Sequence, residues 1–97
     1  MKRKSNSQSI GEVLNQFLKE NHLDEKLVQQ SVVDAWKDIA GQIIKNHTRN
    51  IYFSNRQLIV ELDSDVLRHE VSMQKTRLIQ NVNQYAQYEL IQTLIIK

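Results

Sequence analysis

The stretch WKDIAGQIIKNHTRNIYFSNRQLIVEL, residues 36–62, contains a change of hydrophobic period that decides the fold class. In its first part, up to about Asn46, apolar residues recur three and four positions apart, as they do on one face of a helix. From Thr48 onward β-branched and aromatic residues predominate, and residues 58–62 alternate between two faces. With a polar turn at residues 54–56, this pattern predicts helices followed by a β-hairpin, and therefore an α+β fold.

Gly41 interrupts the helical part of this stretch. A glycine inside a helix costs about 1 kcal/mol relative to alanine, so we predict a break into two helices there. We also expect the chain at Gly41 to approach a neighbouring segment too closely for a side chain. Trp36 is the single tryptophan and falls on the apolar stripe that begins near Asp24, so its predicted place is the core.

Toward the N-terminus, residues 1–8 are polar and charged, and we predict that they form a flexible basic arm. Ser9 and Glu12 have the spacing of a capping box. The apolar residues that follow recur at helical spacing to about Asn21, which predicts an amphipathic helix. Residues 9–97 are predicted to form one globular domain. The cations of the arm are Lys2, Arg3 and Lys4.

Toward the C-terminus, residues 63–65 offer helix caps, and the pattern beyond them predicts one long helix to about Tyr85. Residues 88–96 are predicted to form a third strand. The expected order is α-α(α)-β-β-α-β, with a three-stranded sheet and the helices packed on one face. Because a helix connects the last strand to the hairpin, that strand should lie parallel to one hairpin strand. An uncovered edge strand could pair with a second copy of the chain.

The composition limits which classes of protein and which kinds of site are possible. The 97 residues suit one domain, and the absence of Cys excludes disulfides and Cys-based zinc sites. No apolar run approaches the roughly 20 residues of a membrane span, and no signal peptide is recognisable, so the expected location is the cytoplasm. The net charge of +2 is unevenly spread. The arm is basic, the first half of the body is acidic, and residues 45–77 are mildly basic, which hints at contact with a polyanion.

Signatures of catalysis are missing from the chain. There is no glycine-rich phosphate loop and no nucleophile elbow. The histidines, His22, His47 and His69, are not at metal-ligand spacing, so we expect structural or surface roles for them. Asp63 and Asp65 could bind a divalent cation, although capping of the following helix is the simpler role. We therefore predict no catalytic residue, no metal and no cofactor.

The basic residues of the body are the candidate binding residues. Tyr52 and Phe53 should face opposite sides of the sheet, and an open face with an aromatic residue and flanking cations can hold single-stranded nucleic acid. The alternative is that the aromatic residues are core and the charges form a solvated helix face. On one long helix, Arg68 and Lys75 would share a face because they lie seven positions apart. The predicted nucleic-acid-binding residues in the body are Arg49, Arg56, Arg68, Lys75 and Arg77.

An ordered series of residues resembles the DciA-like family, the bacterial proteins associated with the replicative helicase. The series begins with Trp36, Ile39, Gly41, His47 and Thr48. It continues with an L-x-V strand at residues 58–62, a helix start at residues 66–71, and residues 79–83. The resemblance covers roughly residues 9–96.

The resemblance implies a K-homology-like (KH-like) fold and a non-enzymatic protein that binds the replicative helicase and DNA. The G-x-x-G loop of KH domains is missing, so backbone clamping of nucleotides by that loop is not implied. Two alternatives remain open at this point. One is a protein-interaction module that uses the acidic first half and does not bind DNA, and the other is a KH-like RNA-binding domain.

Overall fold

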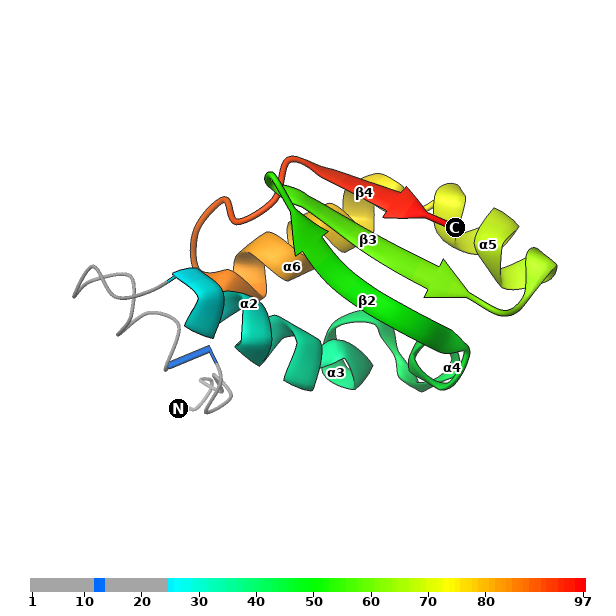
Figure 1. The fold of residues 1–97 in the computed structure, drawn as a ribbon, viewed down its shortest axis with the longest axis horizontal. Coiled ribbons are helices and arrows are strands. Elements are labelled where there is room, and N and C mark those ends of the chain that lie inside the picture. The colour runs from blue at the N-terminus through cyan, green and yellow to red at the C-terminus, as the bar shows by residue number, and fades with distance from the viewer. Residues whose placement is uncertain (1–11, 14–24) are drawn as a thin grey trace, which may run out of the picture.

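The computed structural model describes residues 12–13 and 25–97, and Figure 1 shows their arrangement. Glu12 and Val13 are helical, but the rest of the predicted first helix and the basic arm lie outside the described residues. The described elements are, in chain order, α2 (Glu25–Asp34), α3 (Trp36–Ala40), α4 (Gln42–Asn46), β2 (Thr48–Ser54), β3 (Gln57–Leu62), α5 (Asp65–Ser72), α6 (Lys75–Ala86) and β4 (Thr93–Ile96).

The sheet has the predicted hairpin and the predicted parallel strand. Its order is β2-β3-β4, with β2 antiparallel and β4 parallel to the central strand β3. Asn55 and Arg56 form the two-residue turn, and both have a positive φ, of 50° and 64°. Two left-handed residues in succession are what the favoured hairpin turn requires, because its twist matches that of the strands. The prediction of an α+β fold with a three-stranded sheet is confirmed.

The core lies between the sheet and the helices, and Figure 1 shows α6 passing behind the strands. The residues of β3 that face the helices, Leu58, Val60 and Leu62, are at most 4% exposed. Trp36 is 1% exposed, as predicted. The other buried residues of the helices are Val28 and Val32 of α2, Val71 of α5, and Leu78, Val82 and Ala86 of α6.

The predicted break at Gly41 is confirmed, but the expected reason is wrong. Gly41 separates α3 from α4 with φ 100°. A Cβ atom added there would meet nothing within 4 Å, so no neighbouring segment approaches closely. Glycine is suited to this position because its backbone reaches a positive φ at little cost, whereas a side chain would strain it.

The single long helix predicted after the hairpin is wrong, because α5 and α6 are separated at residues 73–74. The Gln74 N–H donates to the Val71 carbonyl at 2.9 Å, an i→i−3 bond that tightens the end of α5. The two short helices each bury their own apolar residues against the sheet. Arg68 and Lys75 therefore lie on different helices, and the prediction that they share one helical face is also wrong.

The third strand is shorter than predicted, since β4 covers only four of the residues 88–96. The N–H groups of Leu90 and Ile91 are bonded to the side chain of Asn83 and are not in the ladder. Several apolar residues placed on buried stripes are instead exposed, with Ile43 at 67% and Val66 at 72%. Within residues 12–13 and 25–97, no helix has the length and apolar character that crossing a membrane requires.

Candidate nucleic-acid interface

The cations predicted to bind nucleic acid divide into those with partners inside the fold and those without. Lys2, Arg3 and Lys4 lie outside the described residues, so the structure describes five of the eight. Arg56 and Arg68 are held by carboxylates and backbone carbonyls. Arg49 is held at one nitrogen, and Lys75 and Arg77 are exposed at the start of α6.

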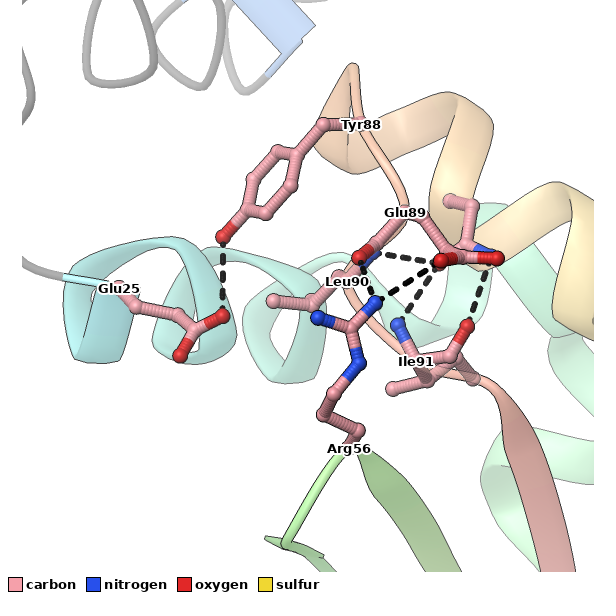
Figure 2. A network of polar contacts seen from close by, with 7 residues as sticks. Glu25, Arg56, Tyr88, Glu89, Leu90 and Ile91 are labelled. Atoms are coloured by element: carbon pink, nitrogen blue, oxygen red, sulfur yellow. Dashed lines mark hydrogen bonds and ion pairs between the residues drawn. The ribbon is translucent and has the colours of Figure 1, made fainter.

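Arg56 connects the hairpin turn to the loop that precedes β4. Its Nη2 donates to the backbone carbonyl of Glu89 at 2.7 Å and to Oε1 of the same residue at 3.0 Å. Figure 2 shows the guanidinium reaching from the turn toward this loop. Because Arg56 has an internal carboxylate and an internal carbonyl as acceptors, less of its charge is available to a ligand.

The same loop is fixed by two further contacts. The Tyr88 hydroxyl donates to Oε1 of Glu25 at 3.4 Å, which ties the loop to α2 (Figure 2). Partial burial, with the adjacent carboxylate of Glu25, raises the pKa of Tyr88 to about 12. The Asn83 side chain accepts from the N–H groups of Leu90 and Ile91 and donates to the Ile91 carbonyl, all at 2.9–3.0 Å. The resemblance series included Asn83 in residues 79–83, but the sequence did not predict its contacts, because an Asn on a helix carries no spacing signal for a distant loop.

At the opposite end of the hairpin, Asp63 joins the start of β2 to the end of β3. Its Oδ1 lies 2.7 Å from Nδ1 of His47, and its Oδ2 lies 3.0 Å from Nε of Arg49. The hydrogen bond to His47, with smaller contributions from the His47 and Arg49 charges, lowers the pKa of the Asp63 carboxyl. The expectation that Asp63 caps a helix is wrong, since Ser64 is the N-cap of α5.

The family-motif residues have structural partners. The Trp36 indole Nε1 donates to the Thr48 hydroxyl at 3.0 Å, and that hydroxyl donates to the Ile44 carbonyl at 2.6 Å. One hydroxyl thus joins α3, α4 and β2, and it satisfies the polar atom of the buried Trp36. His47 ends α4 and accepts, through its carbonyl, the Asp63 N–H at 3.0 Å.

Arg68 is occupied in the same way as Arg56. Its Nη1 donates to the Leu62 carbonyl at 2.5 Å, and its Nη2 forms an ion pair with Asp65. The guanidinium therefore closes the connection between β3 and α5. This contact accounts for an arginine at a position where the sequence suggested nucleic-acid binding.

Lys75 and Arg77 differ from these arginines. Both are exposed, and neither forms an ion pair or hydrogen bond with another side chain in residues 12–13 and 25–97. They lie in the first turn of α6, whose N-cap, Gln74, makes no side-chain capping bond. That turn contains no acidic residue. Helix N-termini carry partial positive charge, so two cations there add to a positive potential that no acid of the turn offsets.

The predicted cations do not gather into one patch. Arg49 lies at the start of β2 and Arg56 in the turn beyond its other end, and the strand between residues 49 and 54 spans roughly 17 Å. Between them, on the face of the sheet away from the core, Tyr52 is 37% exposed and pairs across the ladder with Ile59. Phe53 packs against the core, so the prediction that the two aromatic residues face opposite sides is confirmed.

Two clefts have linings of different character. A groove of about 500 Å³ between the α3–α4 turn and α5 is mainly apolar, and its lining includes Ile43, Leu67 and Val71. A smaller cleft of about 230 Å³ beside β2 is lined by both apolar and cationic residues. Among the described residues there is no group of three His, Asp or Glu side chains that could hold a metal ion.

Comparison with known proteins gives one match. A family model described as "Dna[CI] antecedent, DciA" matches residues 9–96, the range over which the resemblance had been inferred from the residue series. No curated protein and no solved structure matches the chain. The KH-like fold implied by the resemblance therefore stays a prediction.

Proposed function

The chain belongs to the DciA family, which is associated with helicase loading in DNA replication, and we propose that it is a non-enzymatic adaptor that binds the replicative helicase and single-stranded DNA. The family supports the association with the helicase. The proposal that the chain binds single-stranded DNA rests on the properties of the start of α6. We place the protein in the cytoplasm, where its partners would be.

The start of α6 has the properties of a phosphate-binding surface. Lys75 and Arg77 are exposed, and no described residue accepts a hydrogen bond from the backbone N–H of residues 75–77. These N–H groups point out of the positive end of a twelve-residue helix, a position that favours anions. Phosphates of a DNA strand can accept from the N–H groups and, at separate points along the strand, from Lys75 and Arg77, which point in different directions from the helix.

The test is fluorescence anisotropy with a labelled single-stranded oligonucleotide. The double substitution Lys75→Gln with Arg77→Gln should weaken binding at least about tenfold, since two phosphate contacts are lost. The slope of log affinity against log salt should become shallower by about 1.4, the value for two contacts to a single strand. A matched control, Lys37→Gln with Lys97→Gln, removes two exposed cations away from the start of α6 and should bind like the unchanged protein.

Equal weakening by both double variants would mean that only total charge matters, and it would remove the α6 start from the proposal. No binding at low salt by the unchanged protein would reject the DNA-binding function. Competition between DNA and RNA oligonucleotides of the same sequence separates the proposal from an RNA-binding role. Stronger competition by RNA would favour the latter.

For the helicase, we propose the apolar groove between α4 and α5 as the contact surface. Ile43 lines this groove and is 67% exposed, an unusual position for a large apolar side chain without a partner. Ile43→Glu should therefore abolish retention of the protein by the immobilised replicative helicase. Val66→Glu is the matched control, because Val66 is 72% exposed and does not line the groove.

The groove also favours the second candidate function, a protein-interaction module that does not bind DNA. Its mainly apolar lining suits a protein partner, and none of its lining residues is a cation that could pair with a phosphate. Retention by the helicase that depends on Ile43, together with no oligonucleotide binding at low salt, would select this function over the proposed one.

A further inference from the structure

A cleft of about 230 Å³ lies beside β2, the strand at one edge of the sheet. Its apolar side includes Trp36 and Ile51, and its polar side includes Lys45, Arg49 and Asn50. We infer that this cleft binds a phosphate group through Lys45, Arg49 and Asn50. None of the described lining residues is an acid, so two positive charges face the cleft without a carboxylate in its wall.

The local fold presents Arg49 to this cleft. The ladder between β2 and β3 shifts between Thr48 and Asn50, so Arg49 is the extra residue of a β-bulge. Bulges redirect a side chain away from the regular alternation of a strand. Arg49 is 74% exposed, and Asp63 holds only its Nε, at 3.0 Å. Both terminal nitrogens remain as donors, while the carboxylate of Asp63 orients the guanidinium from one side.

Lys45 and Asn50 supply the other donors. Lys45 lies in the last turn of α4, is exposed, and forms no ion pair with a described residue. The Oδ1 of Asn50 accepts the N–H of Ile51 at 3.0 Å, which leaves its amide Nδ2 free to donate. The ammonium of Lys45, the guanidinium of Arg49 and the amide N–H₂ of Asn50 are all hydrogen-bond donors. The charged oxygens of a phosphate are hydrogen-bond acceptors and therefore complement them.

The polar atoms at the inner wall of the cleft already have hydrogen-bond partners within the fold. The Thr48 hydroxyl, which also lines the cleft, accepts from Trp36 and donates to Ile44. It therefore has little capacity for a ligand and instead links the cleft to the indole of Trp36. The volume is below the roughly 300–1,000 Å³ of pockets that enclose a whole small molecule, so it suits a single compact group.

Two sources can supply such a group, namely the backbone of a nucleic acid and free inorganic phosphate. A backbone phosphate would make this cleft a second contact of the strand that binds at the α6 start, and that version rests on the proposed function. The free ion would be independent of it. The chemistry recognised by the cleft is the same in both cases.

The experiment is a titration of the ¹⁵N-labelled full chain with inorganic phosphate at constant ionic strength, followed by NMR. Trp36 is the single tryptophan, so its indole N–H gives one assignable signal at the wall of the cleft. That signal and the Asn50 side-chain amide should shift and saturate. Lys45→Gln and Arg49→Gln should each weaken binding about tenfold, because each removes a charge-assisted hydrogen bond. Arg49→Lys should recover part of the affinity, since it keeps the charge without the planar fork.

Lys37→Gln is the matched control, because Lys37 is exposed on α3 and does not line the cleft. It should bind phosphate like the unchanged protein. Unmoved Trp36 and Asn50 signals in the unchanged protein would overturn the inference. So would an equal loss in Lys37→Gln and Lys45→Gln. The dispersion of the remaining amide signals shows that each variant is folded.

A second arm adds a single-stranded oligonucleotide to the phosphate-saturated protein. Shifts of Trp36 and Asn50 that depend on Lys45 would identify the backbone as the source. Phosphate binding at the cleft without any oligonucleotide binding would support the cleft for the free ion and reject the proposed function. Oligonucleotide binding that needs Lys75 and Arg77, with a cleft that does not respond to phosphate, would keep the proposed function and reject this inference.

Discussion

Arg56 and Arg77 have the same side chain but opposite surroundings. Arg56, at the hairpin turn, donates to the carbonyl and the carboxylate of Glu89, and its contacts fix the loop before β4. Arg77, at the start of α6, is exposed beside Lys75 and has no described ion-pair partner. A cation with internal acceptors contributes to the fold, whereas a cation without them remains available to a ligand. The number of charges in a sequence therefore overstates the charge that a surface can offer.

The loop beside Arg56 is where this comparison predicts the largest effect. Asn83→Ala should lower the free energy of unfolding by about 1–3 kcal/mol, because it leaves the buried N–H of Ile91 without an acceptor. The N–H of Leu90 keeps one acceptor, the Tyr88 carbonyl at 2.8 Å. Urea unfolding followed by circular dichroism measures the change.

Asn81→Ala is the control for this variant, because Asn81 lies on the same helix and its side chain forms no hydrogen bond with a described residue. It should change stability by less than about 0.5 kcal/mol. If the two variants unfold alike, helix propensity and not the loop contact determines the loss.

Asn83 also shows the limit of prediction from the sequence. Period and composition sufficed for the hairpin and the buried Trp36, because each depends on a local pattern that a strand or helix must have. The parallel third strand followed from the helical connection that precedes it. The break between α5 and α6 and the short β4 could not be predicted in this way. Both depend on hydrogen bonds between distant or irregular segments, such as those from Asn83 to residues 90–91.

The candidate site shows the same limit of prediction from the sequence. The sequence identified five cations of the body as candidates, among them Lys75 and Arg77. It could not separate them from Arg56 and Arg68, because the acceptors of those two are backbone carbonyls and carboxylates brought near by folding. Lys45 lies in the mildly basic stretch of residues 45–77 but was not predicted to bind a ligand, since its cleft forms only when β2 packs beside the helices.

Single substitutions of the two arginines test the comparison directly. Arg77→Gln should weaken binding to a single-stranded oligonucleotide about threefold to tenfold and leave the unfolding free energy within about 0.5 kcal/mol. Arg56→Gln should do the reverse and lower stability by up to about 1 kcal/mol, the range of a partly exposed ion pair. Anisotropy and urea unfolding on the same samples give both values. An equal loss of affinity in the two variants would remove the distinction between held and available arginines.

Acid should weaken the end of the hairpin at which Asp63 holds His47 and Arg49. The pKa of Asp63 is lower in the folded chain than in the unfolded chain, so its contribution is complete above the unfolded pKa of about 4. It is lost as the pH falls below that value and through the folded pKa. In Asp63→Asn this part of the acid dependence should disappear, which thermal unfolding at a series of pH values measures. The same acid dependence in both proteins would assign it to other carboxyls.

High pH should weaken the loop before β4, at the other end of the hairpin, through the ionisation of Tyr88. Its pKa is raised to about 12, so the folded chain holds this proton at pH values where the unfolded chain, with a pKa of about 10, has lost it. Stability should therefore fall as the pH rises from about 10 toward 12. In a titration followed by tyrosinate absorbance, a late ionisation step is expected, and Tyr88→Phe should remove that step. Glu25→Gln should shift it to lower pH, because the carboxylate of Glu25 accepts the hydrogen bond and opposes a second negative charge. If the late step is unchanged in Glu25→Gln, burial alone raises the pKa of Tyr88. The carboxylate of Glu25 would then make no electrostatic contribution to the contact between the loop and α2.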